Sequence, residues 1–430
     1  MFEQLKINKS FILYIFAVLL LIWVLFEYTY ALFYATIDSD AGYCLSLARD
    51  ITEGKILYKD IVLHYTPFVI YLFSLIKLLS FSFYNYKLIL LFQFLVIVVD
   101  SFLVYKIATF FTSNKMLRFF GSITTLLLFF RYDGVFLELE PFVVFFSLLA
   151  IYFVLKADDR KLYYLLAGLT ASLSFFSKQF GIIVFIPLVI YILLYEGEFK
   201  KSIVKVLSLA IGGIIPLVVF LFYYNLINDV EILRLFDILT GEGIESFSES
   251  NFLSTIKNFI LYNGIFLIFI PVFFIFQKVN SLKYFVLFSL LFLFFSLSLI
   301  FSSWDHTKQF LIPFIILIGL FVFENVKKTN SISYFFKSLI IFCFLFIIAS
   351  NIKYFADNYQ SWERQKQYQT AKELNNFIPE NSKVLCVNKQ AFIYLCNYQS
   401  VDSQISGYPF IGNWDDNRVR DLLKKTNELY

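Results

Sequence analysis

The stretch TIDSDAGYCLSLARDITEGKILYKDIVLHYTP, residues 36–67, follows a long apolar run at residues 11–33. It carries eight charged side chains: Asp38, Asp40, Arg49, Asp50, Glu53, Lys55, Lys59 and Asp60. A charged side chain at the centre of a bilayer costs about 2.5–3.5 kcal/mol on the insertion scale. We therefore expect this stretch to lie at a membrane surface.

Residues 43–53 keep the period of an amphipathic helix. One face carries Tyr43, Cys44, Leu47, Ala48 and Ile51, the opposite face is charged, and Gly54 supplies a stop signal. Asp38 and Asp40 then lie at the start of a surface helix, close to the end of the first apolar run. Acids there are good N-caps and interact well with the helix dipole, so capping competes with a catalytic role for both.

The whole composition is that of a polytopic α-helical membrane protein. The 430 residues are 59% hydrophobic and 21% aromatic, with a mean hydropathy of +0.73, whereas soluble domains are about 45–50% apolar. We expect the run at residues 11–33 to be a retained anchor, because it is too long for a signal peptide and has no small-residue cleavage site. The four cysteines have no metal-ligand spacing, and no nucleic-acid signature or Gly-rich phosphate loop is present.

Hydropathy predicts about eleven spans. They cover residues 11–33, 88–111, 118–130, 141–156, 162–176, 180–195, 203–226, 257–277, 284–302, 308–324 and 333–350. The apolar segment that begins at Pro67 has Lys77 in its middle, and its uninterrupted part is only about 15 residues, or roughly 22 Å of helix. We predict that this segment lies along the interface and does not cross.

The distribution of basic residues supports that interpretation and sets the orientation. If the segment from Pro67 does not cross and the N-terminus is inside, fourteen basic residues fall on inner connections: Lys106, Lys115, Arg118, Lys156, Arg160, Lys161, Lys200, Lys201, Lys205, Lys278, Lys283, Lys327, Lys328 and Lys337. The outer connections after residue 88 hold five: Arg131, Lys178, Arg234, Lys257 and Lys308. The positive-inside rule therefore predicts an inner N-terminus and an outer C-terminus.

This topology predicts two domains in the cell membrane. Residues 1–350 form the transmembrane domain, with a first external loop at 34–87. Residues 351–430 form a small external α/β subdomain, with helices near 363–377 and 415–429 and strands near 382–387 and 391–396. Polar clusters at 131–140, 177–180, 227–254 and 302–308 join the first loop on the outer face.

Four motifs on that face resemble those of one family. They are DAGY–GKILYKD–HYTP in the first loop (40–43, 54–60 and 64–67), LEPF (139–142), SKQFG (177–181) and HTKQFLIP (306–313). In order and spacing, residues 10–350 resemble GT-C membrane glycosyltransferases of the dolichyl-phosphate-mannose protein mannosyltransferase and aminoarabinose transferase type (glycosyltransferase family 39/83-like). The resemblance implies the GT-C fold and a polyprenyl-phosphate-linked sugar donor.

The resemblance also implies roles for acids. Asp40 matches the acid three residues before the loop tyrosine, Tyr43, and would be the catalytic base, with Asp38 as its rival. Glu140 matches the second acid, which orients the acceptor or a basic partner, and Glu138 is a weaker candidate. For Glu140 the competing interpretation is a helix-start glutamate beside a proline.

The candidate cations follow from the same motifs. Lys178 would bind the carrier phosphate, and His306 and Lys308 would contact phosphate or sugar; an interfacial snorkelling lysine and an interfacial histidine are the competing interpretations. His64 lies where relatives often carry a polar or basic residue. Some relatives have a lysine just before the proline, and this chain departs from that pattern with Thr66.

Asp38-Ser39-Asp40 has a spacing that suits a divalent cation, because carboxylates ligate Mg²⁺. The resemblance implies metal-independent transfer, so we expect no cofactor and no metal ligand.

We therefore expect an inverting glycosyltransferase on the outer face of the cytoplasmic membrane, with a glycan or protein as acceptor. Two other functions fit a chain this apolar. A transporter or flippase of lipid-linked sugars predicts charges at mid-span depth, where Asp100 and Lys106 are modest exceptions. A polysaccharide polymerase or ligase predicts arginines in a large external loop, but residues 227–254 hold only Arg234.

Overall fold

The computed structural model describes residues 9–61, 63, 65–79, 86–195, 198–232, 282–301, 306–326, 345–346, 348–357, 359, 364–378, 383–384 and 399–400. Almost all of these residues that belong to a regular element are helical. The predicted spans at 257–277 and most of 333–350 lie outside the described residues.

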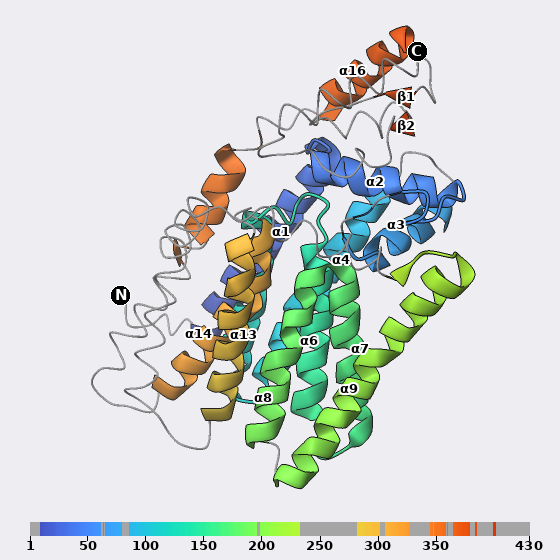
Figure 1. Cartoon of the computed structure of the whole chain (residues 1–430). Coiled ribbons are helices and arrows are strands. Elements are labelled where there is room, and N and C mark those ends of the chain that lie inside the picture. The colour runs from blue at the N-terminus through green and yellow to red at the C-terminus, as the bar shows by residue number, and fades with distance from the viewer. Residues whose placement is uncertain are drawn as a thin grey trace, which may run out of the picture.

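A bundle of helices forms the body of the molecule (Figure 1). Its members are α1 (Lys9–Tyr34), α4 (Tyr86–Ala108), α5 (Lys115–Arg131), α6 (Glu140–Lys156), α7 (Lys161–Ser177), the 3₁₀ helix η1 (Gln179–Val184) with α8 (Phe185–Tyr195), α9 (Phe199–Leu221) with the π-helix η2 (Phe222–Ile227), α13 (Leu282–Phe301), and the 3₁₀ helix η4 (His306–Leu311) with α14 (Ile312–Val326). Each of the other nine predicted spans coincides with one of these helices.

Three of the described helices are long and apolar enough to cross a membrane by themselves: Tyr86–Ala108, Phe199–Ile227 and His306–Glu324. Shorter apolar helices cover Val18–Tyr34, Phe68–Leu79, Gln179–Tyr195 and Lys283–Ser296. The multi-pass membrane architecture is therefore confirmed, whereas the total of eleven spans stays a prediction.

Two helices lie across one end of the bundle, beside the ends of α4, α6 and α7 (Figure 1). They are α2 (Ser39–Thr52) and α3 (Phe68–Leu79). α2 begins earlier than the period of residues 43–53 indicated, because Asp38 caps it. The described part of α3 has 12 residues, and residues 80–85 that follow it lie outside the described residues. The position of α3 across the end of the bundle agrees with the prediction that the segment from Pro67 does not cross.

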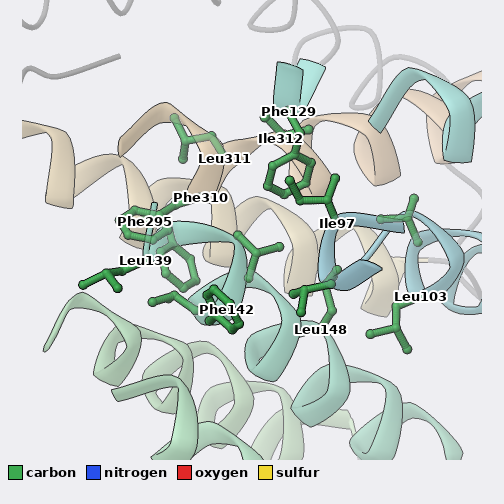
Figure 2. Close-up of a cluster of buried hydrophobic side chains, with 14 of the residues drawn as sticks. Ile97, Leu103, Phe129, Leu139, Phe142, Leu148, Phe295, Phe310, Leu311 and Ile312 are labelled. Carbon is green, nitrogen blue, oxygen red and sulfur yellow. The ribbon is translucent and has the colours of Figure 1, made fainter. Parts of the chain in front are cut away.

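The bundle is held together by close-packed apolar side chains and by small residues between helices. α7 and α9 approach so closely at Gly168 and Gly212 that a Cβ on either would come within 2.0 Å of a carbonyl oxygen of the other helix. Small residues at such crossings are typical of membrane helix packing. Figure 2 shows part of the core, in which Leu139 and Phe142 of the α6 region lie beside Phe295 and Phe310.

The C-terminal part returns to the end of the bundle where α2 and α3 lie (Figure 1). Residues 348–357 are helical, and Phe355 packs against the rings of Trp23, Phe26 and Tyr30 in α1. α16 (Arg364–Phe377) follows, and β1 (Lys383–Val384) pairs in parallel with β2 (Gln399–Ser400). α16 and β1 match the predicted elements, whereas the predicted strand at 391–396 and helix at 415–429 lie outside the described residues.

Candidate functional site

The first acids of the site come from the start of α2. The carboxylate of Asp38 accepts a hydrogen bond of 2.7 Å from the backbone N–H of Ala41, which makes Asp38 the N-cap. Asp40 lies in the first turn of the helix and lines the pocket described below. Burial, followed by the charge of Asp40, raises the pKa of Asp38 to about 7.

The second pair of acids comes from the turn that joins α5 to α6. Glu138 is in the connection, and Glu140 is the first residue of α6, directly before Pro141. The buried side chain of Gln93, in α4, fixes this connection. Its Nε2 donates to the carbonyl oxygens of Gly134 (3.3 Å) and Phe136 (2.6 Å), and its Oε1 accepts from the N–H of Glu138 (2.7 Å).

Lys178 enters the site where the helix α7 ends. Its backbone is extended, with φ −161° and ψ 142°, which turns the chain between α7 and η1. Gly181 allows this turn, because a Cβ there would lie 2.2 Å from the carbonyl oxygen of Ser174. Nζ of Lys178 lies 2.5 Å from Oε1 of Glu140 and 5.2 Å from the centroid of the Tyr65 ring.

His306 and Lys308 are both on η4. Nδ1 of His306 lies 3.6 Å from Oε1 of Glu138, and its Nε2 lies 3.8 Å from Oε1 of Glu140. Phe310 anchors η4 between Phe295 of α13 and Phe180 of η1. The turns that carry His306 and Lys178 are therefore packed together through an aromatic contact.

Asp40, Glu138, Glu140 and Lys178 meet at a small pocket between α2, the α5–α6 connection and the end of α7. It is lined by Asp40, Tyr43, Cys44, Tyr65, Leu137, Glu138, Leu139, Glu140 and Lys178. Burial, followed by the charges of Glu140, Asp38 and Asp40, raises the pKa of Glu138 well above its usual value. The pocket therefore combines acids of different proton affinity with a lysine, an arrangement suited to proton transfer beside an anionic group.

One triad in the site has the chemistry and spacing of cation ligands. One potential ligand atom each of Asp40, Glu138 and His306 lies within 4.8 Å of the other two. Carboxylate and imidazole groups suit Zn²⁺ or Mn²⁺. Of the D-x-D pair, Asp40 belongs to this triad, whereas Asp38, whose carboxylate caps α2, does not.

The structure brings most of the predicted site residues together, although their roles stay predictions. Asp40, Tyr43, Glu138, Glu140, Lys178 and His306 surround or contact the pocket, and Asp38 adjoins it. Lys308 is buried on the same turn as His306, but Nζ lies over the ring of Tyr132, at 5.7 Å. His64 lies outside the described residues.

Sequence reasoning missed Gln93, which orders the connection carrying Glu138, and Tyr65, which lies under Lys178. A signal for Gln93 was present, because it is an amide within the apolar run 88–111, and buried polar side chains need hydrogen-bond partners. Tyr65 belongs to the HYTP motif at 64–67, but the motif by itself gave this tyrosine no role.

This arrangement of helices has counterparts among solved structures. ArnT from Cupriavidus metallidurans bound to undecaprenyl phosphate superimposes with a TM-score of 0.60 at 12% sequence identity, over 90% of this chain and 85% of that one. The Archaeoglobus fulgidus oligosaccharyltransferase tethered with an acceptor peptide gives a TM-score of 0.49 at 12% identity, over 90% of this chain and 61% of that one. Sequence comparison with curated proteins gives no match.

The chain is thus a multi-pass membrane protein with the fold of the GT-C glycosyltransferases. Within it, residues 64–224 match the model of the family described as dolichyl-phosphate-mannose-protein mannosyltransferase. The resemblance inferred from the sequence is thus confirmed for the fold and for this matched segment. The matched residues include Glu138, Glu140 and Lys178, whereas Asp38, Asp40 and His306 lie outside them.

Proposed function

We propose that the protein transfers one sugar from a polyprenyl-phosphate donor to an acceptor hydroxyl on the outer face of the cytoplasmic membrane. The observation that carries this proposal is the convergence of Asp40, Glu140 and Lys178 on one pocket at an end of an apolar helix bundle. A lipid-linked donor suits this layout, because its tail would stay in the bilayer while its phosphate reaches the pocket. ArnT, whose structure was determined with undecaprenyl phosphate, has the same fold.

In the proposed reaction Asp40 is the general base. Its carboxylate takes the proton of the acceptor hydroxyl as the acceptor oxygen attacks the anomeric carbon. The bond from that carbon to the phosphate oxygen breaks, polyprenyl phosphate leaves, and the configuration at the anomeric carbon inverts. A positioned base is typically worth about 10²–10⁴ in rate.

Two features favour Asp40 over Asp38 as this base. The carboxylate of Asp38 already accepts the N–H of Ala41 as the cap of α2, whereas Asp40 lines the pocket. The pKa of Asp38, raised to about 7 by burial and by the neighbouring charge of Asp40, also leaves Asp38 largely protonated at mildly acidic pH. A protonated Asp38 lowers the charge repulsion on Asp40.

The phosphate is proposed to bind at Lys178, assisted by His306. Positive groups aimed at the leaving phosphate stabilise charge that develops in the transition state. Glu140 would hold Lys178 in place through their ion pair. The second carboxylate oxygen of Glu140, Oε2, accepts no hydrogen bond from any described residue, so it is available to orient an acceptor hydroxyl.

The test uses purified protein in lipid with a panel of radiolabelled polyprenyl-phosphate sugars. At least one donor should be consumed by the wild type. Asp40→Asn should lower the rate by about 10²–10⁴ while equilibrium binding of that donor is retained. Asp50→Asn, which changes an acid on the same helix that pairs with Lys55, should leave the rate near the wild-type value.

Two outcomes would overturn the proposal. If donors bind but are never consumed, and liposomes show lipid-linked sugar crossing the bilayer at a rate that Asp40→Asn does not change, the protein is a transporter. If Asp40→Asn and Asp50→Asn are equally active, another group is the base.

A further inference from the structure

The side chain of Gln367, in α16, forms two hydrogen bonds with the backbone of a single residue 330 positions away. Its Oε1 accepts from the N–H of Ile37, and its Nε2 donates to the carbonyl oxygen of Ile37, both at 2.8 Å. This is the pairing that a neighbouring β-strand would offer to an extended residue, provided here by one amide side chain.

Ile37 lies in the short link that leads into α2, the helix that carries Asp40. Residues 35–38 are the non-helical link between α1 and α2, and Ile37 is 1% exposed. The next residue, Asp38, caps α2, and Asp40 follows in its first turn. The conformation at Ile37 therefore determines where the first turn of α2, and with it Asp40, is placed.

α16 is packed against the body of the protein, so the backbone that carries Gln367 is held in place. Ala371 is buried, and Tyr368, Leu374 and Ile378 pack against the hydrophobic core.

The helix at 348–357 makes contacts of its own with the body. Nδ2 of Asn351 donates to the carbonyl oxygen of Leu127 (2.9 Å), and its Oδ1 accepts from the indole of Trp23 (3.2 Å). The hydroxyl of Tyr354 donates to Asp133, in the α5–α6 connection (2.8 Å). The C-terminal segment therefore contacts both backbone segments that carry the acids of the site.

We propose that Gln367 is a positioning residue, which holds Ile37 and thereby the base-bearing start of α2 in place. This inference rests on the proposed function for its catalytic consequence, but not for the contact itself. It also gives α16, which lies in the region predicted as a separate external subdomain (351–430), a direct part in ordering the site.

An amide side chain suits this pair of contacts, because one planar group offers both an N–H donor and an oxygen acceptor. Asparagine and glutamine offer a donor and an acceptor together, whereas glutamate offers acceptors alone when ionised. Gln367→Glu keeps the contact with the N–H of Ile37 and loses the one with its carbonyl oxygen, and Gln367→Ala loses both. Gln365 and Gln369 are exposed residues of the same type on the same helix, so Gln365→Ala is a matched control.

The first measurement is amide hydrogen exchange by mass spectrometry on the whole protein in lipid. In Gln367→Ala, the amides of residues 35–41 should exchange about tenfold faster than in the wild type, because a local opening that releases Ile37 becomes easier. Gln365→Ala should exchange like the wild type. Equal protection in all three proteins would overturn the inference, whatever the protein catalyses.

The second measurement is turnover at saturating donor. Gln367→Ala should lower kcat about tenfold with the donor KM unchanged, because displacing a catalytic group reduces rate more than ground-state binding. Gln367→Glu should fall between Gln367→Ala and the wild type. A rise in KM alone, or equal kcat in all variants, would overturn the positioning role. A wild type that consumes no donor would instead refute the proposed function. The exchange measurement would still show whether Gln367 holds Ile37 in place.

Discussion

Lys178 and Glu140 form a buried ion pair between the end of α7 and the start of α6, 38 residues apart in the chain. Glu140 is fully buried and Lys178 is 7% exposed. Such a pair contributes little net stability, because removing two charges from water costs about as much as their attraction returns. Because the pair lies at the pocket, Glu140 instead suits a role in holding the ammonium group of Lys178 where an anionic headgroup would bind.

Removing one member of this pair should be costly. Lys178→Met leaves the carboxylate of Glu140 buried beside a neutral side chain, so we expect a loss of about 3–5 kcal/mol. The double variant Lys178→Met/Glu140→Gln should recover much of the stability but no donor turnover. Thermal unfolding in detergent, together with donor binding, checks both.

Lys205→Met is the control for this prediction. Lys205 is also buried and pairs with Asp159, but Asp159 has an 81% exposed side chain and remains solvated when its partner is lost. A loss for Lys205→Met as large as that for Lys178→Met would contradict the argument.

Gln93 should matter for activity more than its place in an apolar helix suggests. Gln93→Leu removes three hydrogen bonds to the connection between residues 134 and 138, and we expect a destabilisation of about 1–3 kcal/mol with reduced turnover. Ser101→Ala is the control. It removes bonds between α4 and Ser122, away from the pocket, and should reduce stability with turnover unchanged. Equal turnover in both variants would show that the connection is ordered without Gln93.

The raised pKa of Asp38 predicts the sign of a pH effect on stability. Between the usual value of 3.8 and about 7, the folded protein holds a proton on Asp38 that the unfolded chain releases. The contribution of Asp38 to stability is therefore fully present below about pH 4 and is lost as the pH rises to about 7.

Asp38→Asn isolates this effect, because asparagine also caps helices well. The difference in melting temperature between Asp38→Asn and wild type should widen in favour of the variant from pH 4 to 7. Parallel melting curves over that range would show that Asp38 is ionised throughout.

We predict that transfer needs no divalent cation, because Lys178 can supply positive charge to the leaving phosphate and His306 can donate a hydrogen bond to it. Turnover should then be unchanged by a chelator. Zn²⁺ or Mn²⁺ added in excess should inhibit by binding Asp40, Glu138 and His306, whose ligand atoms are mutually within 4.8 Å. Loss of activity with chelator and its return with one added metal would instead identify the triad as a metal site.

The predicted orientation can be checked by cysteine labelling in intact cells. In a background without native cysteines, Asp60→Cys should react with a membrane-impermeant maleimide, because residue 60 is exposed in the first external loop. Lys161→Cys, exposed at the start of α7, should react only after the membrane is permeabilised. The reverse pattern would place the pocket on the inner face.

The sequence was sufficient for the membrane class and for most helix positions, because a span must bury about 20 apolar residues whatever its neighbours are. The same reasoning separated α3 from the spans, since its length and Lys77 are local properties. It also placed Asp38 and Asp40 at the start of a surface helix, and the structure shows Asp38 as the N-cap of α2 with Asp40 in its first turn.

The sequence by itself determined which residues are charged and that they occupy loops at span ends. The tertiary structure decided which of them meet. Three contacts show this: the ion pair of Lys178 with Glu140, the hydrogen bonds of Gln93 to the α5–α6 connection, and the hydrogen bonds of Gln367 to Ile37. Each joins residues that are 38 or more positions apart in the chain. Hydropathy depends on the chemistry of each residue, whereas these contacts depend on how the helices pack, which no local pattern records.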